Sequence, residues 1–355
     1  MDEPQPELTP EVRPLRYSFW TGAMMLQGSV TPRVLPNVLK FGLVAEAIAI
    51  VALATQHFWN INLSVPVGPF SAAGAVLGLL LVLRTNAGYD RWWEARKLWG
   101  GIVNQSRNLA VAALNYGPDD ANWRKRFVLW TAAFPHVIRR SLREERELPE
   151  VSRLLGPADT ARIAKAEHMP GVVSGELSRM LHHAADHGMS HMAFFQAEQQ
   201  RGQLIDYLGG CERIRNTPLA RSSAIQVRRF ILMFLVSLPF ALLGQFDYEL
   251  FAGTTILGVA ISARLLFVPL FVMLMAYPLL SLDRIGMELQ NPFDTRRLDH
   301  LPLDNLCRTI ERNVMELLRE DTVAGQHAPE LQSTDLPSDV VKALAGSSPT
   351  DTYIS

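Results

Sequence analysis

The chain has 355 residues, of which 48% are hydrophobic and only 19% are charged. Soluble domains average about 25% charged residues, so this composition favours membrane spans combined with a water-facing part. The net charge of −1 argues against a nucleic-acid-binding protein. Two distant cysteines, Cys211 and Cys307, exclude a disulfide scaffold. The acidic start of the chain, with Asp2 and Glu3, predicts no secretory signal peptide.

Four apolar stretches along the chain predict transmembrane helices. They cover residues 34–58, 69–83, 230–246 and 250–282. A helix needs roughly 20 residues to cross the hydrocarbon of a bilayer, and the second stretch is short, so we expect its helix to continue beyond the membrane. A fifth stretch, residues 127–138, is too short and contains Pro135 and His136. It predicts a buried helix of a soluble domain.

The positions of lysine and arginine predict the orientation of the spans. The links at residues 59–68 and 247–253 contain neither residue type. The opposite ends of the spans are flanked by Arg33, Lys40, Arg84, Arg91, Arg228, Arg229 and Arg284. Because cytoplasmic loops carry the excess of positive charge, we expect both termini and the long insert to be cytosolic.

These features predict an all-α membrane protein with two transmembrane hairpins and a large helical cytosolic domain. The expected parts are a cytosolic N-terminal segment (1–30), a first hairpin (31–88), a cytosolic helical domain (89–227), a second hairpin (228–282), a cytosolic helical segment (283–320) and a disordered tail (321–355). We find no internal repeat and no strand-period alternation, and the tail is polar with scattered Pro, Ser and Gly.

The second apolar stretch carries a regular pattern. Ala75, Leu79 and Leu83 recur at every fourth position and therefore share one helix face. Several copies around an axis would form stacked apolar rings, and such constrictions can gate ion flow by dewetting. The alternative is that this face is a stripe for helix packing.

Four sequence motifs connect the chain with a known family. They are GSVTPRVLP (28–36), GYDRWWEARKLWGGIVNQSRNLA (88–110), CERIRNTPL (211–219) and NPFDTRRLDHLPLDNL (291–306). In this order, over roughly residues 15–320, they resemble segments of the bestrophins, especially the bacterial branch. Each motif alone is weak, and the four together are fairly specific.

The resemblance implies a homopentameric ion channel of the bacterial inner membrane, with four spans per chain arranged around a central pore and both termini cytosolic. It implies that Ala75, Leu79 and Leu83 form the apolar neck of the pore, where Ala75 departs from the larger residues usual in the family. Phe194 and Phe195 are candidates for a second, cytosolic constriction, with a packed aromatic pair as the alternative. The implied partners are further copies of the chain, membrane lipid and permeant anions, chiefly chloride. No cofactor is implied.

Other candidate sites were weighed on their chemistry. Glu46 and Arg264 are charges inside apolar stretches, and their estimated depths predict an intramembrane ion pair, unless each meets water or the cytosolic domain separately. His183, His187 and His191 have a helical spacing that could bind a metal, but a solvated histidine cluster is the simpler interpretation. In animal bestrophins, an acidic run after the NPF segment binds calcium. Here Arg296 and Arg297 follow Asp294, so we predict no calcium site.

Arginine-rich segments in the insert have two interpretations. They include Arg124, Lys125, Arg126, Arg139, Arg140, Arg143 and Arg146. Acidic residues alternate with the last of these, which predicts a salt-bridged face, and a basic vestibule that concentrates anions is the alternative. Nothing in the sequence supports an enzyme, because phosphate-binding, dinucleotide-binding and nucleophile motifs are absent.

The function classes that stay open are an anion channel, a cation-selective channel of the same fold, and a non-conducting membrane scaffold that binds a cytosolic partner. A secondary transporter is disfavoured, because the chain lacks two repeated halves with interrupted helices.

Overall fold

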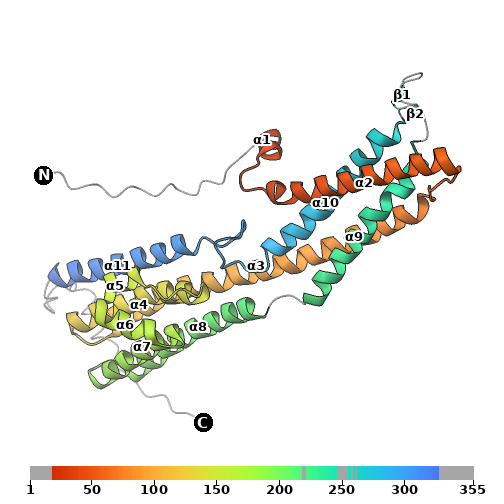
Figure 1. The fold of residues 1–355 in the computed structure, drawn as a ribbon. Helices are drawn as coiled ribbons and strands as arrows, with labels where there is room; N and C mark the ends of the chain where they lie inside the picture. The colour runs from red at the N-terminus through yellow and green to blue at the C-terminus, as the bar shows by residue number, and fades with distance from the viewer. Residues whose placement is uncertain (1–17, 218–220, 247–254, 257–258, 261, 328–355) are drawn as a thin grey trace, which may run out of the picture. The chain divides into compact units, whose positions relative to one another are not determined.

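A computed structural model describes residues 18–217, 221–246, 255–256, 259–260 and 262–327. The elements, in chain order, are α1 (Phe19–Met24), α2 (Thr31–Trp59), α3 (Gly68–Tyr116), α4 (Ala121–Leu142), α5 (Pro149–Leu155), α6 (Pro157–Lys165), α7 (Met169–Asp186), α8 (His191–Asn216), α9 (Arg221–Leu243), β1 (Thr255–Ile256), β2 (Val259–Ala260), α10 (Arg264–Glu288) and α11 (Leu303–His327) (Figure 1). Apart from two short strands, the described elements are helices, which confirms the all-α prediction.

The chain divides into two compact units. One contains the described residues up to Trp99 and from Gly209 to Pro302, and the other contains Gly100 to Leu208 and the described residues from Leu303 onward. Helices α3 and α8 contribute residues to both units. The domain limits predicted at residues 88 and 227 concern the membrane boundary and stay predictions.

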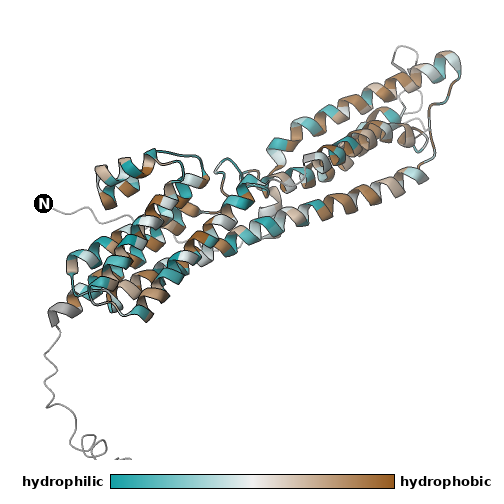
Figure 2. Cartoon of the chain, turned by 90° about the horizontal axis from the view of Figure 1, so that it is seen from below, coloured by the Kyte–Doolittle hydropathy of each residue, from teal (hydrophilic) through white to brown (hydrophobic). Residues whose placement is uncertain are grey.

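Four helices of the described chain are long and apolar enough to cross a membrane. They are α2, α3, α9 from Ser222, and α10. Apolar residues run along α2, α9, α10 and the first part of α3 (Figure 2). The four predicted spans are therefore confirmed as helices, although the fourth begins well after the predicted residue.

The prediction of one apolar span through residues 250–282 is wrong for the described residues before Arg264, and Leu250 itself lies outside the described residues. Helix α10 begins at Arg264, and the described residues before it include the two-residue strands β1 and β2, which pair antiparallel. The segment before α10 is rich in Gly, Thr, Ile and Val, residue types that disfavour a helix. Hydropathy alone does not separate such a segment from the helix that follows it.

Small residues bring α2 and α10 close together. Ala45 and Ala49 on α2 are fully buried and belong to the same apolar cluster as Val268 and Val272 on α10. A Cβ atom at Gly42 would lie 2.7 Å from the sulfur of Met273, so only glycine fits there without a shift. Small residues at helical spacing allow the close backbone approach on which helix association in a membrane depends.

A second apolar cluster joins the buried side of α3 to its neighbours. Leu77 and Leu81 pack in this cluster with Val34 of α2 and Ile231 of α9. This packing fixes the rotation of α3 about its own axis within the first unit.

Helix α4 forms the centre of the second unit. The Asp120 side chain caps its first turn by accepting a hydrogen bond of 2.8 Å from the Asn122 backbone N–H. Phe127, Phe134 and Ile138 are fully buried within it. This confirms that residues 127–138 form a buried helix rather than a span.

The C-terminal prediction is partly corrected. Helix α11 continues through residues 321–327, so the tail predicted from residue 321 does not begin there. Its amphipathic pattern places Ile310 and Val314 in the core, and the apolar face carries the helix beyond the expected limit. Residues 328–355 and 1–17 lie outside the described residues.

Candidate pore helix and its charged surroundings

Helix α3 is the candidate pore helix. Its 49 residues form one continuous helix, about 73 Å long at 1.5 Å per residue. This is more than twice the length that a bilayer needs. The expected continuation of the helix beyond the second apolar stretch is therefore confirmed.

The predicted neck residues lie on a side of α3 that the other described residues leave uncovered. Leu79 is 60% exposed and Leu83 is 57% exposed, and Ala75 is exposed one turn earlier. Leu77 and Leu81, on the opposite face, are buried. The stripe of Ala75, Leu79 and Leu83 therefore does not pack against the other helices that the structure describes.

A cluster of ion pairs connects α3 with two other spans, α9 and α10. The Asp283 carboxylate of α10 accepts a hydrogen bond from Arg84 of α3, directly after Leu83. It also accepts one of 3.0 Å from Nε of Arg228 on α9. One carboxylate thus joins three helices. We missed this cluster in the sequence, although Asp283 follows the fourth apolar stretch and Arg84 and Arg228 flank the others.

The structure does not bring Glu46 and Arg264 together. Arg264 lies at the first position of α10, where its guanidinium donates to the Gln56 side chain and, at 2.9 Å, to the Leu243 carbonyl. Gln56 is ten residues beyond Glu46 on α2, about 15 Å along the helix. The predicted common depth assumed a fourth helix that begins at Leu250, and this start is wrong.

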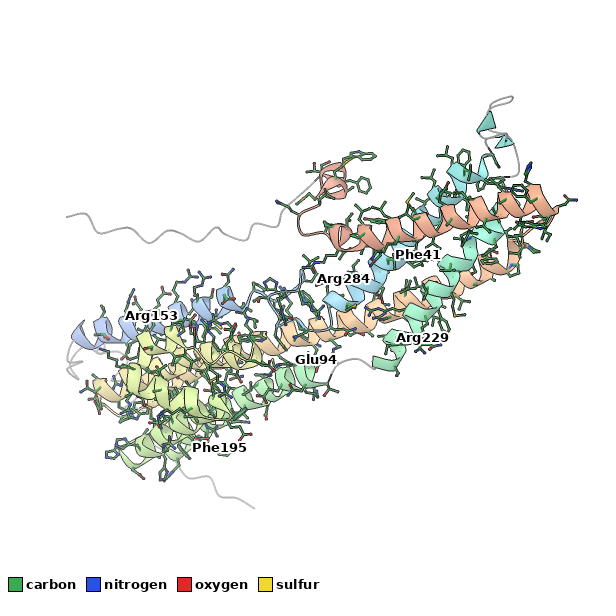
Figure 3. The ribbon with its side chains drawn as sticks, in the orientation of Figure 1. Phe41, Glu94, Arg153, Phe195, Arg229 and Arg284 are labelled. Atoms are coloured by element: carbon green, nitrogen blue, oxygen red, sulfur yellow. The ribbon has the colours of Figure 1, made fainter. Side chains whose placement is uncertain are left out.

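Phe194 and Phe195 lie in the first turns of α8, in the second unit. Phe195, labelled in Figure 3, is 67% exposed, and Phe194 is partly buried. Against the described residues, Phe195 is therefore not packed as the alternative of an aromatic pair would require. Their role in a constriction stays a prediction.

The histidine spacing does not continue along one helix. Helix α7 ends at Asp186 and α8 begins at His191, with Gly188 at a φ of 103° between them. His183 and His187 stack with ring centroids 4.0 Å apart. Among the residues that the structure describes, no three His, Cys, Asp or Glu side chains are grouped as a metal site.

The NPF segment forms a turn whose acidic residue is held by an arginine. The Asp294 carboxylate accepts a hydrogen bond of 3.0 Å from Nε of Arg296. This bond lowers the pKa of Asp294. The prediction that this segment does not bind calcium rests on the same arginine, which competes for the carboxylate.

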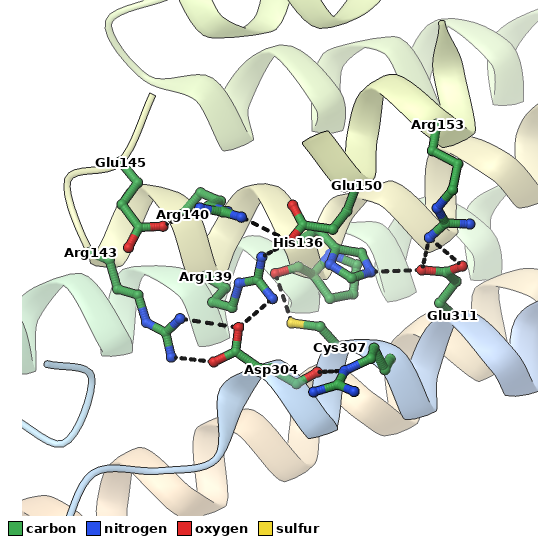
Figure 4. A network of polar contacts seen from close by, with 12 residues as sticks. His136, Arg139, Arg140, Arg143, Glu145, Glu150, Arg153, Asp304, Cys307 and Glu311 are labelled. Atoms are coloured by element: carbon green, nitrogen blue, oxygen red, sulfur yellow. Dashed lines mark hydrogen bonds and ion pairs between the residues drawn. The ribbon is translucent and has the colours of Figure 1, made fainter. Parts of the chain in front are cut away.

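A dense network of ion pairs fills part of the second unit (Figure 4). Arg139 of α4 donates to Glu150 and to Asp304, each at 2.7 Å. Arg140 donates to Glu150 at 2.8 Å and to Glu145 at 2.6 Å. Arg143, in the segment for which a solvated salt-bridged face is predicted, pairs with Asp304 at 2.8 Å. Arg139 lies before that segment and is buried.

The network shifts the acidity of its members. Burial raises the pKa of Glu150, but hydrogen bonds from Arg140 and Arg139 outweigh it and bring the pKa to about 2. Burial raises the pKa of the Cys307 thiol to about 12, so this cysteine is not a nucleophile near neutral pH. His136, also buried, lies 3.0 Å from Glu311, which Arg153 holds from the other side.

Comparison with known proteins identifies the family. A family described as Bacterial/Fungal Bestrophin protein matches residues 11–316. The chain belongs to the bacterial and fungal bestrophins. This bestrophin is 32% identical over 319 residues to the voltage-dependent anion channel-forming protein mll4386 of Mesorhizobium japonicum, covering 87% of this chain and 92% of the relative. It is 29% identical over 308 residues to the similarly named RSc3414 of Ralstonia nicotianae, covering 85% and 92%.

A solved structure has the same fold as this bestrophin. The crystal structure of a bacterial bestrophin homolog from Klebsiella pneumoniae superimposes with a TM-score of 0.69 at 26% identity, covering 81% of this chain and 98% of that one. The expected family and fold are thereby confirmed. The chain is a multi-pass membrane protein of a channel-forming family rather than an enzyme.

Proposed function

We propose that this bestrophin is the subunit of a homopentameric channel that conducts anions, chiefly chloride, passively across the membrane. The observation that carries the proposal is the uncovered apolar face of α3, which has Leu79 and Leu83 at its centre. Its relatives in Mesorhizobium and Ralstonia are named as voltage-dependent anion channel-forming proteins. Symmetric assembly of several copies is the simplest way to line an axis with one repeated helix face.

In the proposed pore, Ala75, Leu79 and Leu83 form three stacked rings. Such rings have no charge, so they oppose ion passage by losing water when they are narrow rather than by electrostatic repulsion. Alanine extends less far from the helix than leucine, and the ring at Ala75 is therefore wider. The two leucine rings set the conductance.

Phe194 and Phe195 are proposed to line a second constriction outside the membrane. The exposed Phe195 side chain and its neighbour at the start of α8 supply an apolar surface that the chain itself does not cover. Replacing Phe195 by alanine is expected to raise the current less than widening the neck does.

The proposed orientation follows from the arginines. Residues 60–67, between α2 and α3, contain no lysine or arginine, whereas Arg33, Arg84, Arg228 and Arg284 lie at the other ends of the spans. We therefore place these arginines and both termini in the cytoplasm. The named relatives are bacterial, so we assign the channel to the bacterial inner membrane.

One observation favours a cation-selective channel instead. Asp90 is exposed and lies eleven residues after Leu79, which places it on the same face of α3. A ring of carboxylates beside the pore would attract cations. The two functions share the fold and the neck and differ in the sign of the permeant ion.

The test is a recording from purified protein in a planar bilayer under an asymmetric KCl gradient, with the mass of the purified complex determined first. Discrete currents that reverse near the chloride potential support the proposal. Reversal near the potassium potential assigns the chain to the cation-selective alternative. A pentamer that stays silent over a range of pH and voltage, also after the neck is widened, favours a scaffold that does not conduct.

A further inference from the structure

A pocket of about 450 Å³ opens between α2, α9 and α10, on residues that the neck does not use. Its lining includes Arg33 and Phe41 of α2, Arg228 and Leu232 of α9, and Asp283 and Arg284 of α10. Figure 3 marks Phe41 and Arg284, together with Arg229 on α9. All of these residues belong to the first unit. The pocket lies at the ends of the three spans where the arginines gather.

The charges around this pocket do not balance. Asp283 is shared between Arg84 and Arg228. The buried Glu288 carboxylate is shared between Arg33 and Arg284, each at 2.7 Å. Four guanidinium groups thus meet two carboxylates, which leaves an excess of two positive charges.

The excess charge is open to a ligand. The side chains of Arg228, Arg33 and Arg284 are 47%, 35% and 32% exposed, so each guanidinium keeps donors that its carboxylate does not use. Arginine presents five donors in a planar fork that suits phosphate oxygens. An anionic phosphate group, with several acceptor oxygens, fits this set of donors better than a neutral ligand does.

The other end of the pocket is apolar. Phe41 and Leu232 line it from the interior of α2 and α9, and Leu232 is largely exposed. A ligand that covers the whole pocket must therefore carry a hydrocarbon part next to its anionic group. Inorganic phosphate alone would leave the apolar side chains of this wall without a contact.

We propose that this pocket binds an acidic phospholipid, with the headgroup phosphate between Arg228 and Arg284 and an acyl chain against Phe41 and Leu232. Basic pockets between transmembrane helices at the cytoplasmic face favour such headgroups. Phosphatidylglycerol, with one phosphate, neutralises half of the excess charge, and cardiolipin, with two phosphates, neutralises all of it, whereas a zwitterionic lipid neutralises none. The site is separate from the uncovered face of α3, so the proposal does not depend on which ion the channel conducts.

Two double variants with equal loss of charge test the site. R228Q/R284Q removes two arginines of the pocket and leaves each carboxylate one arginine partner, Arg84 for Asp283 and Arg33 for Glu288. R229Q/R296Q removes two arginines outside the pocket lining and is the matched control. Full-length protein is equilibrated with mixed micelles of phosphatidylglycerol and phosphatidylcholine, and the lipid that it retains is quantified by mass spectrometry.

We expect wild type and R229Q/R296Q to retain phosphatidylglycerol in preference to phosphatidylcholine. In R228Q/R284Q the apparent affinity should fall by about thirtyfold, from the loss of two arginine contacts. If the double variant does not fold, R228Q and R284Q singly should each lose about fivefold. Equal retention by both double variants overturns the proposal. Complete displacement of the lipid by millimolar inorganic phosphate also overturns it, because the site would then bind a free anion.

Discussion

Helices α3 and α4 combine composition and burial in opposite ways. The first part of α3 is strongly apolar, yet only 11% of its most apolar stretch is buried within the chain. Helix α4 contains Arg124, Lys125, Arg126, Arg139 and Arg140, yet most of its residues are buried. Most of the apolar surface of α3 therefore does not pack in a core of the described chain. It is available to lipid or to further copies, whereas α4 is the core of its unit.

The two regions also differ in how they hold charge. At the end of the spans, Arg84 pairs with one carboxylate among the described residues, that of Asp283. In the second unit, Arg139 and Arg140 each have two carboxylate partners. Removing one carboxylate should therefore cost more beside α3 than beside α4. Substitutions in each region test this contrast.

The largest effect is expected in the core around α4. Phe134→Ala empties a fully buried position and should lower the free energy of unfolding by about 3–5 kcal/mol. Phe195→Ala removes the same side chain from an exposed position and should change it by less than about 0.5 kcal/mol. Thermal unfolding of the purified protein in detergent, followed by tryptophan fluorescence, measures both. Equal destabilisation would mean that Phe195 is covered in the assembled protein.

Asp283→Asn should have the next largest effect. It removes the negative charge with which both Arg84 and Arg228 pair, so both guanidinium groups lose this ionic partner. Breaking a buried pair by removing one partner typically costs about 3 kcal/mol or more. Unfolding in the same detergent gives the value. Asp294→Asn is the control, since the side chain of its partner Arg296 is 89% exposed, and it should cost far less.

Glu150→Gln should be milder. The change removes two hydrogen bonds from arginines, but Arg139 keeps Asp304 and Arg140 keeps Glu145, so the loss should be about 2 kcal/mol and smaller than that of Asp283→Asn. A loss as large as that of Asp283→Asn would contradict the idea that shared partners protect the network.

The same carboxylate predicts a pH dependence. The pKa of Glu150 is about 2 in the folded chain and about 4.3 when unfolded, so its contribution to stability is complete above the unfolded value. This contribution is lost as the pH falls from about 4.5 toward 2. Wild type should therefore lose more of its melting temperature over this range than Glu150→Gln does. Parallel curves would show that other acids dominate.

The number of spans and the buried helix at residues 127–138 could be predicted from apolar length alone. The start of the fourth span could not, because an apolar segment rich in Gly and β-branched residues has the hydropathy of a helix without its propensity. The pairing of Glu46 with Arg264 failed for the same reason, since the depth of Arg264 was counted from that start. A depth counted along a helix is correct only if the residue at which the helix begins is known.

Contacts between elements distant in sequence were the least predictable. The sequence predicted charges at the ends of the spans but not that Asp283 joins Arg84 to Arg228, because such partners depend on how the helices are rotated about their axes. The neck face was predicted from periodicity, and the structure shows that this face is uncovered. What covers it is a question of assembly, which the pattern within one chain does not contain.

The smallest effect on stability is expected where the effect on function is proposed to be largest. Leu79→Ala with Leu83→Ala removes two exposed side chains and should change the free energy of unfolding of the chain by less than about 1 kcal/mol in total. The single-channel current should rise, because smaller side chains widen the apolar rings and let water stay in them.

Leu81→Ala is the matched control on the buried face of α3. It should cost about 2–5 kcal/mol of stability and should leave the current of the remaining folded channels unchanged. Bilayer recordings and unfolding of the same preparations separate the two effects. If the Leu79 and Leu83 variant conducts as wild type does, the exposed face of α3 contacts lipid, and the pore must be lined by another surface of the chain.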